Sequence, residues 1–187
     1  MFSRLKIAAA IVAVAATAAL AAYASTNEPG AEAAALQTGA QAPDFAGINN
    51  WLNSAPLDMK QLHGKVVLVD FWTFDCINCA HTIPHVEDWY SRYHDKGLVV
   101  VGVHTPEYGF EHDTDNLKKA IKQYGITYPV AQDNQYATWN AYGNQYWPAV
   151  YLIDQSGKLV YTHFGEGDYA QTEQVIRGLL GIKGQQG

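Results

Sequence analysis

The chain of 187 residues contains 12 lysine and arginine residues against 18 aspartate and glutamate residues, which gives a formal net charge of −6. This acidic balance, without a cluster of basic residues, argues against binding to nucleic acid, because the phosphate backbone attracts lysine and arginine. The only two cysteines, Cys76 and Cys79, lie close together. A framework of structural disulfides would join distant segments and would normally use more cysteines, so the composition also argues against that class of protein.

The first residues of the chain have the pattern of an export signal. Two basic residues, Arg4 and Lys6, precede an uncharged apolar run over residues 7–22, and the small-x-small pattern AYA ends at Ala24. The pattern predicts a secretory signal peptide over residues 1–24. An uncleaved membrane anchor is the alternative, although the run is short and rich in alanine for a spanning helix of about 20 residues. In either case we expect the rest of the chain outside the cytoplasm, in the periplasm.

The next segment, residues 25–41, is rich in alanine, glycine and polar side chains, and it predicts a flexible leader. Residues 42–183 suit one domain of ordinary size with a sizeable core. Apolar segments of strand and helix type alternate along this domain, which predicts the α/β class.

The predicted elements follow one another in chain order: a strand over residues 66–72, a helix over 76–93, a strand over 98–103, a helix over 116–124, a strand over 128–131, a helix over 136–142, strands over 149–154 and 159–163, and a helix over 172–180. The first two strands are apolar almost throughout, as expected of parallel strands that are covered on both faces. The helix between them predicts a right-handed βαβ unit, with a kink at Pro84. The last two strands predict a hairpin, since Gly157 can supply a positive φ in the turn.

Both cysteines lie where the first strand delivers the chain to the first helix. Unpaired backbone N–H groups and the helix dipole favour a thiolate at a helix N-terminus, so we expect Cys76 to have a lowered pKa and to be the attacking thiol. Cys79 follows one turn later and can resolve a mixed disulfide. A purely structural disulfide is the alternative, but so short a loop would stabilise the fold only weakly. The motif therefore predicts redox chemistry.

Residues around this motif resemble thioredoxins. Asp70 lies six positions before Cys76, in Val-Asp-Phe-Trp, and Pro84 lies five positions after Cys79. The wider context, FWTFDCINC followed by GLVVVGVHTPEY, resembles the TlpA-type branch, in particular the extracytoplasmic domain of DipZ-like proteins, and also the redoxin and AhpC/TSA-like families. The resemblance covers residues 43–182. It implies a thioredoxin fold with a central mixed β-sheet flanked by helices, an N-terminal β-hairpin extension and a strand–helix insertion.

The resemblance also implies roles for two acidic residues. Asp70 matches the buried acid that exchanges a proton with the second cysteine, here Cys79, and burial would raise its pKa toward the range that suits proton transfer. The alternative for Asp70 is a carboxylate at the end of a strand, satisfied by backbone donors. Glu107 matches a region from which TlpA-type proteins place an accessory acid near the site, and a solvated loop residue is the alternative.

A third implied feature is the proline that faces the cysteine pair in thioredoxin folds. Pro148 follows Trp147 and opens a predicted strand, so we expect a cis peptide bond that leaves the preceding backbone free to pair with an extended substrate. A trans proline that merely starts an edge strand is the alternative. We expect Trp147 and Trp72 to contact the substrate.

Together these features predict an extracytoplasmic thiol–disulfide oxidoreductase, a reductase of protein disulfides that needs no cofactor and no metal. The resemblance implies a membrane electron donor of the CcdA type. Two other functions stay open. A copper-binding chaperone would use Cys76, Cys79 and His81 as ligands. A thiol peroxidase of the peroxiredoxin type would share the pattern Thr73-x-x-Cys76, although Val69 stands where that motif needs proline.

Overall fold

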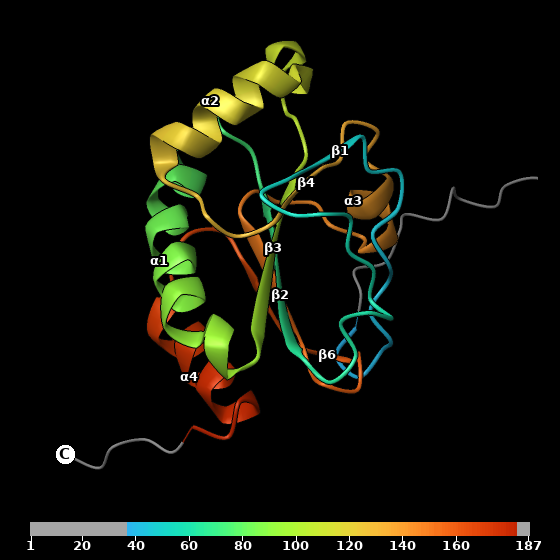
Figure 1. Cartoon of the computed structure of the whole chain (residues 1–187), viewed down its shortest axis with the longest axis vertical. Helices are drawn as coiled ribbons and strands as arrows, with labels where there is room; N and C mark the ends of the chain where they lie inside the picture. The colour runs from blue at the N-terminus through green and yellow to red at the C-terminus, as the bar shows by residue number, and fades with distance from the viewer. Residues whose placement is uncertain (1–36, 183–187) are drawn as a thin grey trace, which may run out of the picture. The chain divides into compact units, whose positions relative to one another are not determined.

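The computed structural model describes residues 37–182 (Figure 1), so the predicted signal peptide and residues 25–36 of the predicted leader lie outside the described residues. The strands form one six-stranded sheet in the order β1-β4-β3-β2-β5-β6. The strands are β1 (Asn50–Leu52), β2 (Val66–Trp72), β3 (Leu98–His104), β4 (Val130–Gln132), β5 (Ala149–Ile153) and β6 (Leu159–Phe164). The helices are α1 (Ile77–Tyr93), α2 (Thr114–Tyr124), α3 (Ala137–Ala141) and α4 (Tyr169–Leu179), with short 3₁₀ turns η1 (His94–Lys96) and η2 (Gly109–His112). None of these helices is long and apolar enough to cross a membrane.

Strand β2 lies at the centre of the sheet. It pairs in parallel with β3 and antiparallel with β5, and all seven of its residues are buried. This explains its nearly continuous apolar sequence, in which Asp70 is the only charged residue. The predicted βαβ unit, β2–α1–β3, is therefore confirmed, and it brings the carboxyl end of β2 directly to the start of α1.

The two faces of the sheet are covered by different elements (Figure 1), which agrees with the predicted central mixed sheet flanked by helices. Helices α1, α2 and α4 cover one face, where Leu68 and Trp72 of β2 join the core. Helix α3 and the N-terminal segment cover the other face, where Phe71 packs edge-on against Trp139. Successive side chains of β2 point to opposite faces of the sheet, as in any strand, so they join two separate hydrophobic clusters.

The N-terminal extension differs from the predicted hairpin. In the described residues it contributes one short strand, β1, which pairs antiparallel with β4 of the insertion, and an isolated bridge between Gln41 and Lys158. After β1 the chain runs through bends, an unassigned stretch and a turn over residues 59–64, which ends at Gly64 with a positive φ, and it forms no strand before β2. Strand β4, which lies between β1 and β3 in the sheet, therefore supplies the partner that a second hairpin strand would have supplied.

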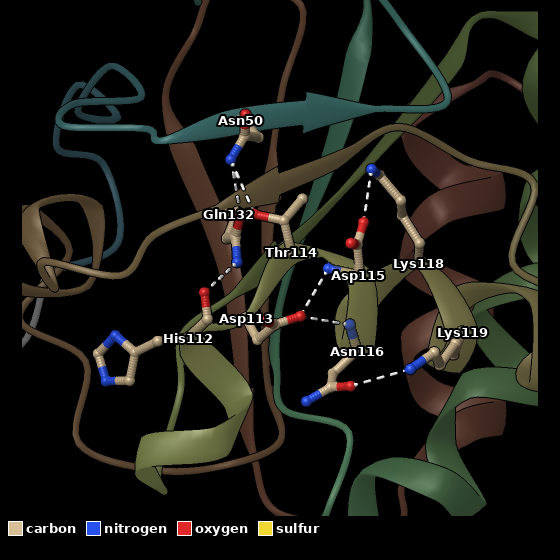
Figure 2. Close-up of polar contacts among 9 residues, drawn as sticks. All are labelled: Asn50, His112, Asp113, Thr114, Asp115, Asn116, Lys118, Lys119 and Gln132. Atoms are coloured by element: carbon tan, nitrogen blue, oxygen red, sulfur yellow. Dashed lines mark hydrogen bonds and ion pairs between the residues drawn. The ribbon is translucent and has the colours of Figure 1, made fainter.

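Helix α2 begins two residues earlier than predicted, because Asp113 caps it (Figure 2). The Asp113 carboxylate accepts hydrogen bonds from the backbone N–H groups of Asp115 (2.8 Å) and Asn116 (2.9 Å). Such a cap satisfies donors that the first turn of a helix leaves free. The sequence DTDN in this region looks like a polar loop, and only the cap shows where the loop ends.

A glycine in β3 permits the tightest packing on the α1 face. Gly102 lies opposite Asp70 in the sheet, and a Cβ atom at this position would lie 2.8 Å from Cε2 of Tyr128 and 3.0 Å from Nε1 of Trp72. Both rings are fully buried and cannot move aside freely. The absence of a side chain at Gly102 thus allows two large aromatic residues, Trp72 and Tyr128, to pack against the sheet on the face that α1 covers.

We predict that Gly102→Ala lowers the free energy of unfolding by about 1–3 kcal/mol, the usual cost of overpacking a core. Gly178→Ala in α4 is the matched control, because a Cβ atom there meets no atom within 4 Å and alanine favours a helix. Urea denaturation of both variants measures the difference. Equal stability of the two variants would contradict the packing argument.

Candidate active site

The two cysteines meet at the first turn of α1. Cys76 is the N-cap residue, and its sulfur accepts a hydrogen bond from the backbone N–H of Cys79 at 3.2 Å. The Cys79 thiol donates to the same sulfur, with the two Sγ atoms 2.6 Å apart. Both cysteines are free thiols in this structure; Cys76 is half-buried and Cys79 is fully buried. A partner can therefore reach Cys76, while Cys79 lies directly behind it.

These contacts separate the acidities of the two thiols. The hydrogen bond from the Cys79 thiol, with help from the N–H groups of Cys79 and Asn78, lowers the pKa of Cys76 to about 7, against the opposing effects of burial and of the Glu107 charge. The pKa of Cys79 is raised far above its ordinary value, because its thiol donates to Cys76 and because it is buried. Near neutral pH, Cys76 is thus the thiolate and Cys79 keeps its proton.

Asp70 is buried beneath this pair, on the face of β2 that α1 covers. Burial, and secondarily the charge of Cys76, raise the pKa of Asp70 to about 7. Neither carboxylate oxygen has a hydrogen-bond partner among the described residues. This geometry gives no support to the alternative in which backbone donors satisfy the carboxylate. A carboxyl group with a pKa near 7 can accept a proton from a neighbouring thiol and return it.

Trp147 and Pro148 lie directly before β5, next to the carboxyl end of β2, from which the chain leads to the cysteines. The bond between them is cis, as predicted. Ala149, the next residue, pairs with Phe71 near the carboxyl end of β2. The indole of Trp147 is half-buried: its Nε1 donates to the carbonyl of Thr105 at 3.1 Å, and its ring lies 4.2 Å from that of Trp139 between centroids. One part of Trp147 remains available to a partner.

The prediction for Trp72 was wrong. Its side chain is fully buried in the core under α1, with its ring edge-on to His104 at 5.2 Å. It cannot contact a protein substrate. The side chains of β2 alternate between the two faces, and both faces are covered, so every aromatic residue of this strand is a core residue.

Glu107 lies in the loop after β3, and its side chain is exposed. Its negative charge raises the pKa of Cys76, as the smallest of the effects on that thiol. The role of an accessory acid stays a proposal.

Glu111, four residues further on, is a residue that the sequence did not reveal. Its carboxylate is fully buried and accepts hydrogen bonds from the backbone N–H groups of Asp75 (3.0 Å), Glu107 (2.7 Å) and Tyr108 (2.8 Å), and from the Thr73 hydroxyl. These hydrogen bonds hold the pKa of Glu111 below its ordinary value although burial opposes them. A glutamate in a polar loop gives no sequence signal of burial, because its partners are backbone groups from two segments.

His104 at the end of β3 is a second buried residue near the site. Its ring stacks on Phe74 at 5.3 Å between centroids, and its Nε2 lies 3.5 Å from the Thr73 hydroxyl oxygen. Burial lowers its pKa to about 4, so the imidazole is neutral at physiological pH. It fills the space behind the residues that precede Cys76.

Comparison with known proteins agrees with this fold and site. Residues 37–178 match the family described as Redoxin. The chain belongs to the Redoxin family. Within it, the chain is similar to protein DipZ of Mycobacterium bovis, with 54% identity over 151 residues that cover 79% of this chain. The alignment covers only 22% of DipZ, so the chain spans less than a quarter of that relative.

Other matches in the same Redoxin region cover a larger part of the matched protein. The thiol-disulfide oxidoreductase ResA of Bacillus thuringiensis is 32% identical over 146 residues, which cover 78% of each protein. A thioredoxin-like protein solved in solution in its oxidised form has a TM-score of 0.70 and 29% identity, over 78% of this chain and 98% of that one. The predicted family and the predicted thioredoxin fold are therefore confirmed.

The alternatives to redox exchange find little support in this Redoxin domain. His81 lies on the exposed side of α1, where its Nδ1 is 3.2 Å from the Glu166 carboxylate. Across residues 37–182, no group of three or more His, Cys, Asp and Glu side chains is arranged to hold a metal ion. His81 is thus not grouped with the two cysteines in a set of three that could hold a metal ion. In the peroxidase-like pattern, the Thr73 hydroxyl is buried and already donates to Glu111.

We predict that Asp70→Asn changes how stability depends on pH. The pKa of Asp70 is about 7 in the fold against an ordinary 3.8, so the folded state keeps a proton that the unfolded state loses as pH rises between these values. Because only the unfolded state loses this proton, the free energy of unfolding falls by up to about 4 kcal/mol as the pH rises from the ordinary pKa of Asp70 to its pKa in the fold. The Asn variant lacks this carboxyl group, and its stability relative to the parent should increase with pH.

Urea denaturation at about pH 4 and about pH 8, with the cysteines joined as a disulfide so that they do not titrate, measures this difference. Because other titrating groups such as His104 are common to both proteins, the comparison isolates Asp70. Stability curves of the two proteins that run parallel with pH would show that Asp70 has an ordinary pKa.

Proposed function

We propose that this Redoxin chain catalyses thiol–disulfide exchange on other proteins, with Cys76 as the attacking thiolate and Cys79 as the resolving thiol. The observation that carries the proposal is the asymmetric pair: a half-exposed Cys76 with a pKa of about 7, and a buried Cys79 thiol hydrogen-bonded to it. The similarity to a protein named thiol-disulfide oxidoreductase ResA supports the same activity.

The proposed reaction in the reducing direction has two steps. The Cys76 thiolate attacks one sulfur of a substrate disulfide, forms a mixed disulfide with it and releases the other substrate sulfur as a thiolate, which takes a proton from water. Asp70 then accepts the proton of Cys79, and the Cys79 thiolate attacks the Cys76 sulfur. This closes the 76–79 disulfide, releases the second substrate thiolate and transfers two electrons from the protein to the substrate.

The surface around the cysteines suits a protein substrate. Four large apolar side chains are exposed on segments that adjoin the site, namely Ile77 (68%), Tyr108 (46%), Phe110 (50%) and Tyr146 (53%). Exposed apolar groups of this size commonly mark protein-binding surfaces. We place the substrate backbone along Trp147 and Pro148, because this segment lies beside the end of β2 and the indole of Trp147 is partly free.

The direction of electron flow and the cellular location are part of the proposal. We propose a reductase in the periplasm that receives electrons from a membrane carrier of the CcdA type. The export pattern at the N-terminus supports the location, with a membrane anchor as the alternative. The resemblance of the sequence to TlpA-type proteins is what implies such a membrane donor.

We predict that Cys76→Ser reduces exchange with a disulfide-containing model protein to the uncatalysed background, because the attacking sulfur is lost. Cys79→Ser is the informative partner variant. It keeps the attacking thiolate, so it should accumulate a mixed disulfide with the substrate that mass spectrometry detects. Full activity of Cys76→Ser, or a trapped disulfide on Cys79 in that variant, would overturn the assigned roles.

A further inference from the structure

The buried carboxylate of Glu111 joins two segments of the active site, one with each oxygen. Oε1 accepts from the Thr73 hydroxyl and from the N–H of Asp75, directly before Cys76. Oε2 accepts from the N–H groups of Glu107 and Tyr108, in the loop after β3. The backbone that carries Glu107 is therefore tied to the backbone that precedes the reactive cysteine.

The chain directly after Glu111 is held from outside the site, by Gln132 at the end of β4 (Figure 2). The Gln132 amide nitrogen donates to the carbonyl of His112 at 3.0 Å, next to Glu111 in the chain. Its amide oxygen accepts from Asn50 of β1 and from the Thr114 hydroxyl, each at 2.9 Å. Gln132 is fully buried. The loop is thus anchored to the sheet edge at one end and to the residues before Cys76 at the other.

We propose that Glu111 is a positioning residue of the active site: it holds the backbone of Glu107 against the segment before Cys76 and so fixes how strongly the Glu107 charge acts on the attacking sulfur. The inference rests on the proposed function only in that Cys76 is the attacking thiol. Among the ionisable groups of the described residues, Cys79 of α1 and Glu107 of the loop act on the pKa of Cys76, and the charge of Cys76 in turn acts on Asp70 of β2 and Tyr124 of α2. Glu107 is the one that Glu111 controls.

This arrangement has a consequence for the direction of electron flow. A neighbouring negative charge disfavours the Cys76 thiolate, and a less stable thiolate makes the reduced form of the protein less stable. The pair then gives up its electrons more readily. By holding Glu107 in place, Glu111 favours the reducing direction of exchange.

The test is a double-mutant cycle with Glu107→Gln, Glu111→Gln and the double variant in the reduced full chain. The readout is the pKa of Cys76, taken from the pH dependence of its alkylation by iodoacetamide at low salt and resolved from Cys79 by mass spectrometry. Each single variant should lower this pKa, by a few tenths of a unit up to about one unit. In the Glu111→Gln background, the further effect of Glu107→Gln should vanish, because Glu107 is already displaced.

Two variants control for charge and for general loosening of the fold. Glu111→Asp keeps the charge but is too short to hold both segments, so it should also lower the pKa of Cys76 and serves if Glu111→Gln does not fold. Glu87→Gln breaks a similar tether far from the cysteines, where Glu87 accepts from the N–H (3.0 Å) and the hydroxyl of Thr127, and it should leave the pKa unchanged.

Additive effects of Glu107→Gln and Glu111→Gln, or an unchanged pKa in Glu111→Asp, would overturn the positioning role. The alkylation readout does not depend on a substrate protein. If Glu107→Gln has no further effect in the Glu111→Gln background but the protein does not exchange disulfides, only the proposed function is contradicted. If the protein exchanges disulfides but the two substitutions act additively on the pKa of Cys76, only the positioning role of Glu111 is contradicted.

Discussion

The hydrogen bond from the Cys79 thiol to the Cys76 sulfur is the contact on which the proposed chemistry depends. It lowers the pKa of the exposed sulfur and raises that of the buried one, so that one thiol can attack while the other holds its proton until it is needed. The N-terminus of α1 makes this possible, because Cys76 occupies the cap and Cys79 lies one turn later, within reach of the same sulfur.

The rest of the fold places three groups around that bond. Strand β2 is buried on both faces, which desolvates Asp70 and brings its pKa close to that of Cys76. Trp147 and Pro148 lie directly before β5, next to the carboxyl end of β2. The loop after β3 brings Glu107, and Glu111 holds that loop to the residues before Cys76. Each group comes from a different strand or a loop that adjoins it, and all lie toward the end of the sheet where β2 and β3 finish. Open α/β sheets place their sites at the carboxyl ends of their strands.

The sequence predicted the β2–α1–β3 unit and the two cysteines well, because both depend on local patterns: a continuous apolar strand, helical spacing and a motif at a helix start. Features that depend on distant partners were missed. Trp72 lies next to the active-site loop in sequence, yet its side chain is fully buried in the core. Glu111 is buried by backbone donors from two segments, and the partner of β1 is β4, a strand far along the chain. Neither pairing leaves a periodic signal.

We propose that the Cys76–Cys79 pair works as a reductant. The dipeptide between the cysteines, Ile77-Asn78, does not by itself fix the direction of electron flow, so the reduction potential of the pair is the decisive quantity. It is measured in defined thiol buffers, with tryptophan fluorescence as the probe. We predict a value below about −230 mV, in the range of thioredoxin-like reductants, and a value above about −160 mV, in the range of oxidases and isomerases, would contradict the reductant role.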